Sequence, residues 1–124
     1  ESMTCKVSRA GHEPCILFRR SQDAIYEILP KGRLMGLNLE PNYTLHEFPL
    51  EAGDRLILFT DGIIETINSQ STFFGKKQLK HFIKKYKDKP ASECVHAIID
   101  ELKHFAYPNE SFNDDITLII IDIK

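Results

Sequence analysis

The sequence lacks the features that mark membrane, disulfide-rich and nucleic-acid-binding proteins. No apolar run reaches the roughly 18 residues that a membrane-spanning helix needs, and the first residues do not resemble a signal peptide. The three cysteines, Cys5, Cys15 and Cys94, are too few and too widely spaced for a disulfide framework or a paired metal motif. The net charge is -2 without a long basic run, which argues against a nucleic-acid surface. We therefore expect a cytoplasmic chain with reduced thiols, no membrane insertion and no nucleic-acid partner.

The composition is that of an ordinary soluble globular domain. Of the 124 residues, 42% are hydrophobic and 27% are charged, and the chain contains no internal repeat or low-complexity tract. A chain of this length can bury roughly two thirds of its unfolded surface, so it can support a core without disulfides. Cys15 and Cys94 are then expected as small core residues. We interpret residues 1–124 as a single region.

The first two thirds of the chain alternate between short apolar segments and turns, which is typical of β-strands. Glycine and proline mark a turn at residues 10–14, and residues 52–54 predict a tight turn. Residues 30–42 hold two glycines and two prolines and predict a long loop, which in a compact domain is often functional. Strands are expected at residues 3–9, 15–18, 24–29, 43–50 and 55–60.

Two amphipathic helices are expected in the last third. Apolar residues recur at helical spacing twice, and Pro90 lies at the start of the second series, where a missing N–H costs least. Each helix should place its apolar stripe on a flat apolar surface. The lysines of the first helix are most simply a solvated face, with a partner-docking face as the alternative. The stripes are Leu79, Phe82, Ile83 and Tyr86, then Val95, Ile98, Ile99, Leu102 and Phe105; the lysines are 76, 77, 80, 84 and 85.

Residues 116–123 are almost continuously aliphatic, which predicts a strand buried on both faces. Residues 56–59 have the same character. A sheet that carries two such strands needs cover on both sides, and two helices can cover only one. A second sheet or further polypeptide must therefore cover the other.

Acidic residues lie at one end of each of these two strands. Asp61 follows the first strand, and Asp114 and Asp115 precede the second, so antiparallel pairing would place them at one rim of the sheet. Two carboxylates ~4 Å apart repel by about 4 kcal/mol at an effective dielectric near 20. A raised pKa or a bound cation would relieve this repulsion. Hard oxygen ligands favour Mg²⁺ or Mn²⁺ over Zn²⁺, and Gly62 would let the backbone approach an ion or a substrate closely.

Each of these features also has a purely structural interpretation. Asp61-Gly62 is a common turn signal by itself, and Asp114 and Asp115 can simply flank a strand. A histidine in a turn, such as His12, is more often a surface or packing residue. The coincidence of both acidic sites at one predicted rim is what favours a functional site.

Five segments, in this order, resemble the bacterial branch of the metal-dependent PP2C-type serine/threonine phosphatases, the sporulation stage II E and sigma-factor regulator type. The resemblance covers almost the whole chain. The individual pieces are short, and it is their order and spacing that carry the resemblance. The segments are AGHEP (10–14), LMGL (34–37), LEAGDRLILFTDGIIET (50–66), FGKKQL (74–79) and NDDITLIIIDI (113–123).

The resemblance implies a fold, a reaction and a set of site residues. The fold would be α+β, two antiparallel sheets with helices outside each, an α-β-β-α sandwich. Asp61 and Asp114 would bind metal in a two-metal Mn²⁺ or Mg²⁺ centre, whose bridging water attacks phosphoserine or phosphothreonine. The substrate would be a regulatory phosphoprotein, a small STAS-type antagonist of an anti-sigma factor. Residues expected near the metal or the substrate are Gly11, His12, Thr60, Gly62, Glu65 and Asp115.

The resemblance begins midway through the family domain, so the chain corresponds to its C-terminal half. The other half would hold the remaining metal ligands. We therefore expect weak or no activity from this chain alone, and a homo-oligomer formed through its exposed apolar surface.

Two other classes remain open. One is a non-catalytic, phosphatase-like module that binds a partner. The other is a phosphoacceptor domain of receiver type, but its strands and helices should alternate from the start, whereas here the helices come late.

Overall fold

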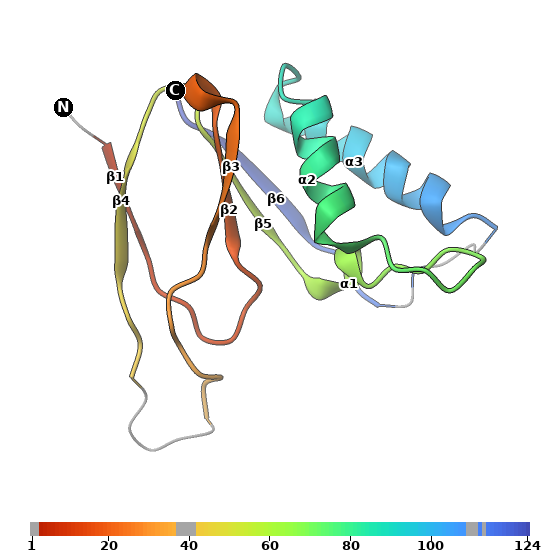
Figure 1. Cartoon of the computed structure of the whole chain (residues 1–124), viewed down its shortest axis with the longest axis horizontal. Helices are drawn as coiled ribbons and strands as arrows, with labels where there is room; N and C mark the ends of the chain where they lie inside the picture. Colours follow the sequence, from red (N-terminus) through yellow and green to blue (C-terminus); the bar gives the residue numbers. More distant parts are fainter. Residues whose placement is uncertain (1–2, 37–41, 109–111, 113) are drawn as a thin grey trace.

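The computed structural model describes residues 3–36, 42–108, 112 and 114–124, which form three layers (Figure 1). A two-stranded sheet forms one outer layer, a four-stranded sheet the middle, and two helices the other outer layer. Leu37 and Asn113, which belong to two of the motifs, lie outside the described residues, as does part of the predicted loop 30–42. The elements are β1 (Met3–Val7), β2 (Cys15–Arg19), η1 (Arg20–Gln22), β3 (Ala24–Ile28), β4 (His46–Leu50), β5 (Arg55–Phe59), α1 (Asp61–Ile64), α2 (Gly75–Lys85), α3 (Ala91–Ala106) and β6 (Leu118–Asp122).

The four-stranded sheet has the order β3-β2-β5-β6, and every neighbouring pair is antiparallel. Phe59 pairs with Leu118 and Arg55 with Asp122, so β5 ends where β6 begins. This confirms the antiparallel pairing predicted from the two aliphatic segments. It also fixes one end of the sheet as the rim that carries Asp61 on one strand and the 114–115 segment on the other.

Helices α2 and α3 cover one face of this sheet. The centres of their apolar stripes, Leu79 and Ile83 on α2 and Ile98 and Leu102 on α3, are buried as predicted and close a core with alternate side chains of β2, β5 and β6. The buried Arg55 joins the layers, because its guanidinium contacts Asp122 (2.6 Å) and the carbonyl of Lys89 (2.6 Å) between the helices. The centre of this core is Ile16, Phe18, Ile57, Phe59, Ile63, Phe74, Leu79, Ile83, Cys94, Ile98 and Leu102.

The lysine face of α2 is solvated, and much of it is also paired within the chain. Three lysines spaced one helical turn apart meet acids of the β1–β2 turn and of the β2–β3 hairpin. The pairs are Lys76–Glu13 (2.7 Å), Lys80–Glu27 (2.6 Å) and Lys84–Asp23 (3.4 Å).

The two-stranded sheet of β1 and β4 covers only part of the opposite face. A second core lies between the sheets and includes Cys15, Leu17 and Phe48. The prediction that residues 116–123 are buried on both faces is wrong: Ile119 and Ile121 are 46% and 43% exposed. The reason is that β6 is the edge strand, beyond the part of the sheet that the described residues of β1 and β4 cover.

Some predicted boundaries also move. Asp61-Gly62 is the start of the one-turn helix α1, whereas the purely structural interpretation of this pair was a turn. The strand expected at residues 43–50 begins at His46, and α3 begins directly after Pro90, as predicted. Within the described ranges, no helix has the length and apolarity needed to cross a membrane.

Candidate functional site

The β5–β6 rim is held together by the side chain of Thr60. The backbone N–H of Thr60 donates to the carbonyl of Thr117 (3.1 Å), and the N–H of Thr117 donates to the hydroxyl of Thr60 (3.0 Å). The same hydroxyl donates to the carbonyl of Asp115 (3.2 Å). The chain therefore leaves β5 at Asp61 directly beside the point where the 114–115 segment enters β6.

Gly62 lies in close contact with this segment. A Cβ at position 62 would lie 2.4 Å from the carbonyl oxygen of Asp115 and 3.5 Å from Cβ of Asp114. The glycine is thus required by the packing of two protein segments, whereas the sequence suggested the approach of an ion or substrate. Replacement of Gly62 by any other residue would push the two acidic segments apart.

Asp61 and Asp114 are exposed carboxylates with one oxygen each in a local hydrogen bond. Oδ1 of Asp61 accepts from the N–H of Gly62 (3.1 Å), and Oδ1 of Asp114 accepts from the N–H of Asp115 (2.7 Å). Within the described part of the chain, neither Oδ2 has a hydrogen-bond partner, and no lysine or arginine pairs with Asp61, Asp114 or Asp115. The acidic side chains at this rim therefore have no counter-charge from a described lysine or arginine.

This donor set fits a hard divalent cation, because carboxylate oxygens with free lone pairs are the ligands of Mg²⁺ and Mn²⁺. It does not provide a complete shell. Among residues 3–36, 42–108, 112 and 114–124, no group of three histidine, cysteine, aspartate or glutamate side chains is placed to hold a metal ion. The described chain can supply part of a metal centre and needs further ligands.

The turn between β1 and β2 brings Gly11 and His12 to the same rim. A cavity of about 120 Å³ is lined by both residues together with Glu13, Thr60 and Asp61. Gly11 adopts a φ of +88°, which favours glycine, and a Cβ there would also meet the side chain of Leu34.

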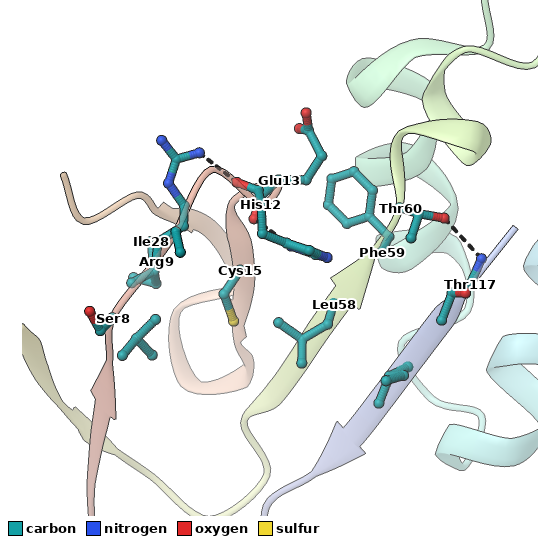
Figure 2. A pocket seen from close by; sticks show the side chains of 13 residues that line it. Ser8, Arg9, His12, Glu13, Cys15, Ile28, Leu58, Phe59, Thr60 and Thr117 are labelled. Carbon is teal, nitrogen blue, oxygen red and sulfur yellow. Dashed lines mark hydrogen bonds between the residues drawn. The ribbon is translucent and has the colours of Figure 1, made fainter. Parts of the chain in front are cut away.

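A larger cavity of about 290 Å³ adjoins the first and shares His12, Glu13 and Thr60 with it (Figure 2). Its walls are mainly apolar and come from both sheets, with Val7 from β1 and Leu58 and Ile119 from the four-stranded sheet. Figure 2 shows the ring of His12 reaching across this cavity toward Thr60. Nδ1 of His12 lies 3.0 Å from the carbonyl of Glu13; since a carbonyl only accepts, Nδ1 carries the proton in this contact. Nε2 is then the nitrogen available to a ligand.

Two of the predicted residues, Glu65 and Asp115, take part in the contacts at the rim through backbone groups. Glu65 ends α1, and its backbone N–H donates to the carbonyl of Asp61 (2.8 Å), but it lines neither cavity. Asp115 contributes its backbone carbonyl to Thr60, while its side chain is exposed.

Sequence reasoning missed Glu13 and Thr117. Glu13 lines both cavities and pairs with Lys76, and Thr117 continues the ladder at the rim. Both residues belong to segments that carry the family resemblance, AGHEP (10–14) and NDDITLIIIDI (113–123), but no pattern in the sequence gave either of them a role at the site.

Two solved phosphatase domains share this fold. The SiaA-PP2C domain of Pseudomonas aeruginosa superposes with a TM-score of 0.79 at 20% identity, over 96% of this chain and 47% of that domain. The manganese-presoaked phosphatase domain of SpoIIE from Bacillus subtilis gives a TM-score of 0.72 at 21% identity, over 99% of this chain and 55% of that one. The predicted α+β class with antiparallel sheets and flanking helices is thereby confirmed.

Sequence comparison identifies the family. The family model of Stage II sporulation protein E (SpoIIE) matches residues 1–124, so the chain belongs to this family. Phosphoserine phosphatase RsbU of Bacillus subtilis is 30% identical over 115 residues, which are 93% of this chain and 33% of RsbU. The chain therefore spans about a third of this curated relative and about half of the two solved phosphatase domains. The predicted resemblance to the bacterial PP2C-type phosphatases is confirmed.

Proposed function

We propose that residues 1–124 form one half of the catalytic domain of a cytoplasmic, metal-dependent phosphatase that acts on phosphoserine or phosphothreonine in a regulatory protein. The observation that carries the proposal is the juxtaposition of Asp61 and Asp114 at one rim without a cationic partner among the described residues. Membership of the SpoIIE family and the likeness to a phosphoserine phosphatase support the reaction. The three free cysteines support a reducing compartment.

In this proposal Asp61 and Asp114 hold Mn²⁺ or Mg²⁺ through their free carboxylate oxygens. A divalent metal pair bound there would supply an activated water for hydrolysis of the phosphoester. Thr60 fixes the 115–117 backbone against Asp61, and Gly62 permits the close packing that this requires. Gly11 and His12 line the space beside Asp61, where the phosphoester would lie.

The remaining metal ligands come from the other half of the domain in a longer polypeptide. The exposed Ile119 and Ile121 support this division, because an apolar sheet face of this kind needs cover. When the chain is isolated, the same face drives self-association into a homo-oligomer. We propose a small STAS-type antagonist of an anti-sigma factor as the substrate, in keeping with the family.

The proposal is tested on the longest natural polypeptide that contains residues 1–124. Hydrolysis of a phosphoserine peptide should depend on Mn²⁺ or Mg²⁺, and Asp61→Asn should lower its rate by about 100-fold or more, since loss of even outer partners of metal ligands costs 10–100-fold. Asp88→Asn, which changes an exposed carboxylate paired with Arg20 far from the rim, is the matched control. Residues 1–124 alone should be inactive or weakly active. Metal-independent hydrolysis, or full activity of the Asp61→Asn variant, contradicts the proposal.

A second candidate is a phosphatase-like binding module without catalysis. The observation in its favour is that the described residues contain no group of three potential metal ligands. If the long polypeptide binds no divalent ion in a calorimetric titration yet still binds its phosphoprotein partner, this second function replaces the first.

A further inference from the structure

The ion pair between Lys76 and Glu13 connects helix α2 to the turn that carries His12. Nζ of Lys76 lies 2.7 Å from Oε2 of Glu13. We propose that Lys76 is a positioning residue of the site: through Glu13 it sets where the Gly11–His12 turn lies relative to Asp61. This inference rests on the proposed function of the rim, and it extends the site to a residue of helix α2.

The N-terminal end of α2 is fixed relative to Asp61-Gly62 by a short chain of contacts. The hydroxyl of the buried Thr66 donates to the carbonyl of Gly62 (2.8 Å), and the carbonyl of Thr66 accepts from the N–H of Phe74 (2.8 Å). Phe74 is buried directly before α2 and stacks on Phe82, with ring centroids 5.8 Å apart. The backbone position of Lys76 is therefore fixed relative to Asp61 and Gly62.

The β1–β2 turn is held from two sides. On one side, Nε of Arg9 donates to the carbonyl of Pro30 (3.3 Å), and Nη1 of Arg9 donates to the carbonyl of His12. On the side that faces α2, the ionic contact of the turn is that between Glu13 and Lys76. The β1–β2 turn and helix α1, which both border the site, are thus linked through α2.

The contact differs from an ordinary surface pair, because one carboxylate oxygen of Glu13 is buried although its side chain as a whole is 28% exposed. Its Oε2 is shielded from solvent and accepts no hydrogen bond from the described residues, so the ammonium of Lys76, 2.7 Å away, offsets its charge as an ion pair. A buried carboxylate oxygen left without a partner is unfavourable, so removal of the ammonium should move Glu13 toward water. Because Glu13 and His12 are adjacent, the His12 ring moves with it.

Lys80 provides a matched control on the same helix face. Its ion pair with Glu27 has a length of 2.6 Å, and the side chains of Lys76 and Lys80 are equally exposed, at 37% each. Glu27 lies on β3 and lines neither cavity. Lys80→Met therefore removes an equivalent pair without touching the turn.

The test compares Lys76→Met, Lys76→Arg and Lys80→Met in the longest natural polypeptide that contains residues 1–124. Lys76→Met should lower kcat/KM toward a phosphoserine peptide by about tenfold or more, because small displacements in a site are costly. Lys80→Met should leave kcat/KM unchanged, and both Met variants should shift the thermal midpoint equally. Lys76→Arg keeps the charge and should restore most of the activity. Equal kcat/KM for the two Met variants overturns the inference.

A second readout does not depend on activity. In amide and imidazole NMR spectra of the same polypeptides, Lys76→Met should shift the signals of Gly11 and His12, and Lys80→Met should not. If the wild-type protein has no phosphatase activity, the proposed function fails and this comparison alone decides the positioning role. Unchanged Gly11 and His12 signals in Lys76→Met then overturn it.

Discussion

Thr60 and Thr117 are joined by two hydrogen bonds at the rim of the four-stranded sheet, one through the backbone and one through the Thr60 hydroxyl. The same hydroxyl also reaches the carbonyl of Asp115. One side chain therefore fixes the 115–117 backbone beside Asp61. The proposed metal centre depends on this connection, because its two carboxylates come from segments that are distant in the sequence.

Replacement of Thr60 tests the connection. Thr60→Val keeps the shape but leaves the N–H of Thr117 and the carbonyl of Asp115 without this partner. We expect the free energy of unfolding in urea to fall by about 1 kcal/mol. Mn²⁺ affinity of the long polypeptide, measured by calorimetry, should fall about tenfold, as for other residues that orient metal ligands. Thr60→Ser retains the hydroxyl and should resemble the wild type. Wild-type Mn²⁺ affinity in Thr60→Val is incompatible with a role for this hydroxyl.

Gly62→Ala should weaken both stability and metal binding. The added Cβ would lie 2.4 Å from the carbonyl oxygen of Asp115, so the acidic segment has to move. Overpacking of this kind typically costs about 1–3 kcal/mol. Thermal unfolding and a Mn²⁺ titration of the same variant measure the two effects. If Gly62→Ala is as stable as the wild type and binds Mn²⁺ equally well, the close packing at the rim is not needed.

Asp122 should contribute to the loss of stability in acid. Burial acts to raise its pKa, but the hydrogen bonds and charge of Arg55, with the N–H of Ala91, outweigh burial and hold the pKa below its usual range. A carboxylate with a lowered pKa in the folded state stabilises the protein above its unfolded pKa, about 3.9. That contribution is lost as pH falls through the folded-state pKa.

Urea unfolding of the wild type and of Asp122→Asn, from neutral pH to below about pH 3.9, isolates this contribution. The variant should be less stable at neutral pH, and the difference between the two proteins should shrink in acid. Surface acids with lowered pKa values, Asp23, Glu51 and Glu101, are common to both proteins and cancel in the comparison. A difference that is constant with pH argues against the Arg55–Asp122 interaction as its source.

The sequence predicted the parts of the fold that depend on local pattern. The stripe that contains Leu79 and Ile83 identified α2, and the two aliphatic segments identified β5 and β6 with their antiparallel pairing. The pairing of β1 with β4 joins residues as distant in the sequence as Met3 and Leu50, and no local pattern predicts it. The exposure of Ile119 follows from the limited extent of that second sheet, so an aliphatic run alone could not reveal it.

The candidate site was predictable to a similar degree. The coincidence of Asp61 and Asp114 at one rim followed from strand order, and the structure brings their segments together through Thr60 and Gly62. The approach of His12 to Asp61 was expected only from the family resemblance, since it depends on how the β1–β2 turn packs across the sheet. The Lys76–Glu13 contact joins two exposed-type residues on separate elements, for which the sequence carries no signal.

The most direct test of the central claim is a Mn²⁺ affinity cycle on the longest natural polypeptide that contains residues 1–124, with Asp61→Asn, Asp114→Asn and the double variant. If both carboxylates serve one metal centre, each single variant should lose at least about tenfold in affinity, and the double variant should lose clearly less than the sum of the two free-energy changes. Asp100→Asn, at an exposed position on α3, should bind as the wild type does. Full Mn²⁺ affinity in either single variant, or strictly additive losses in the double variant, would contradict a shared metal centre at Asp61 and Asp114.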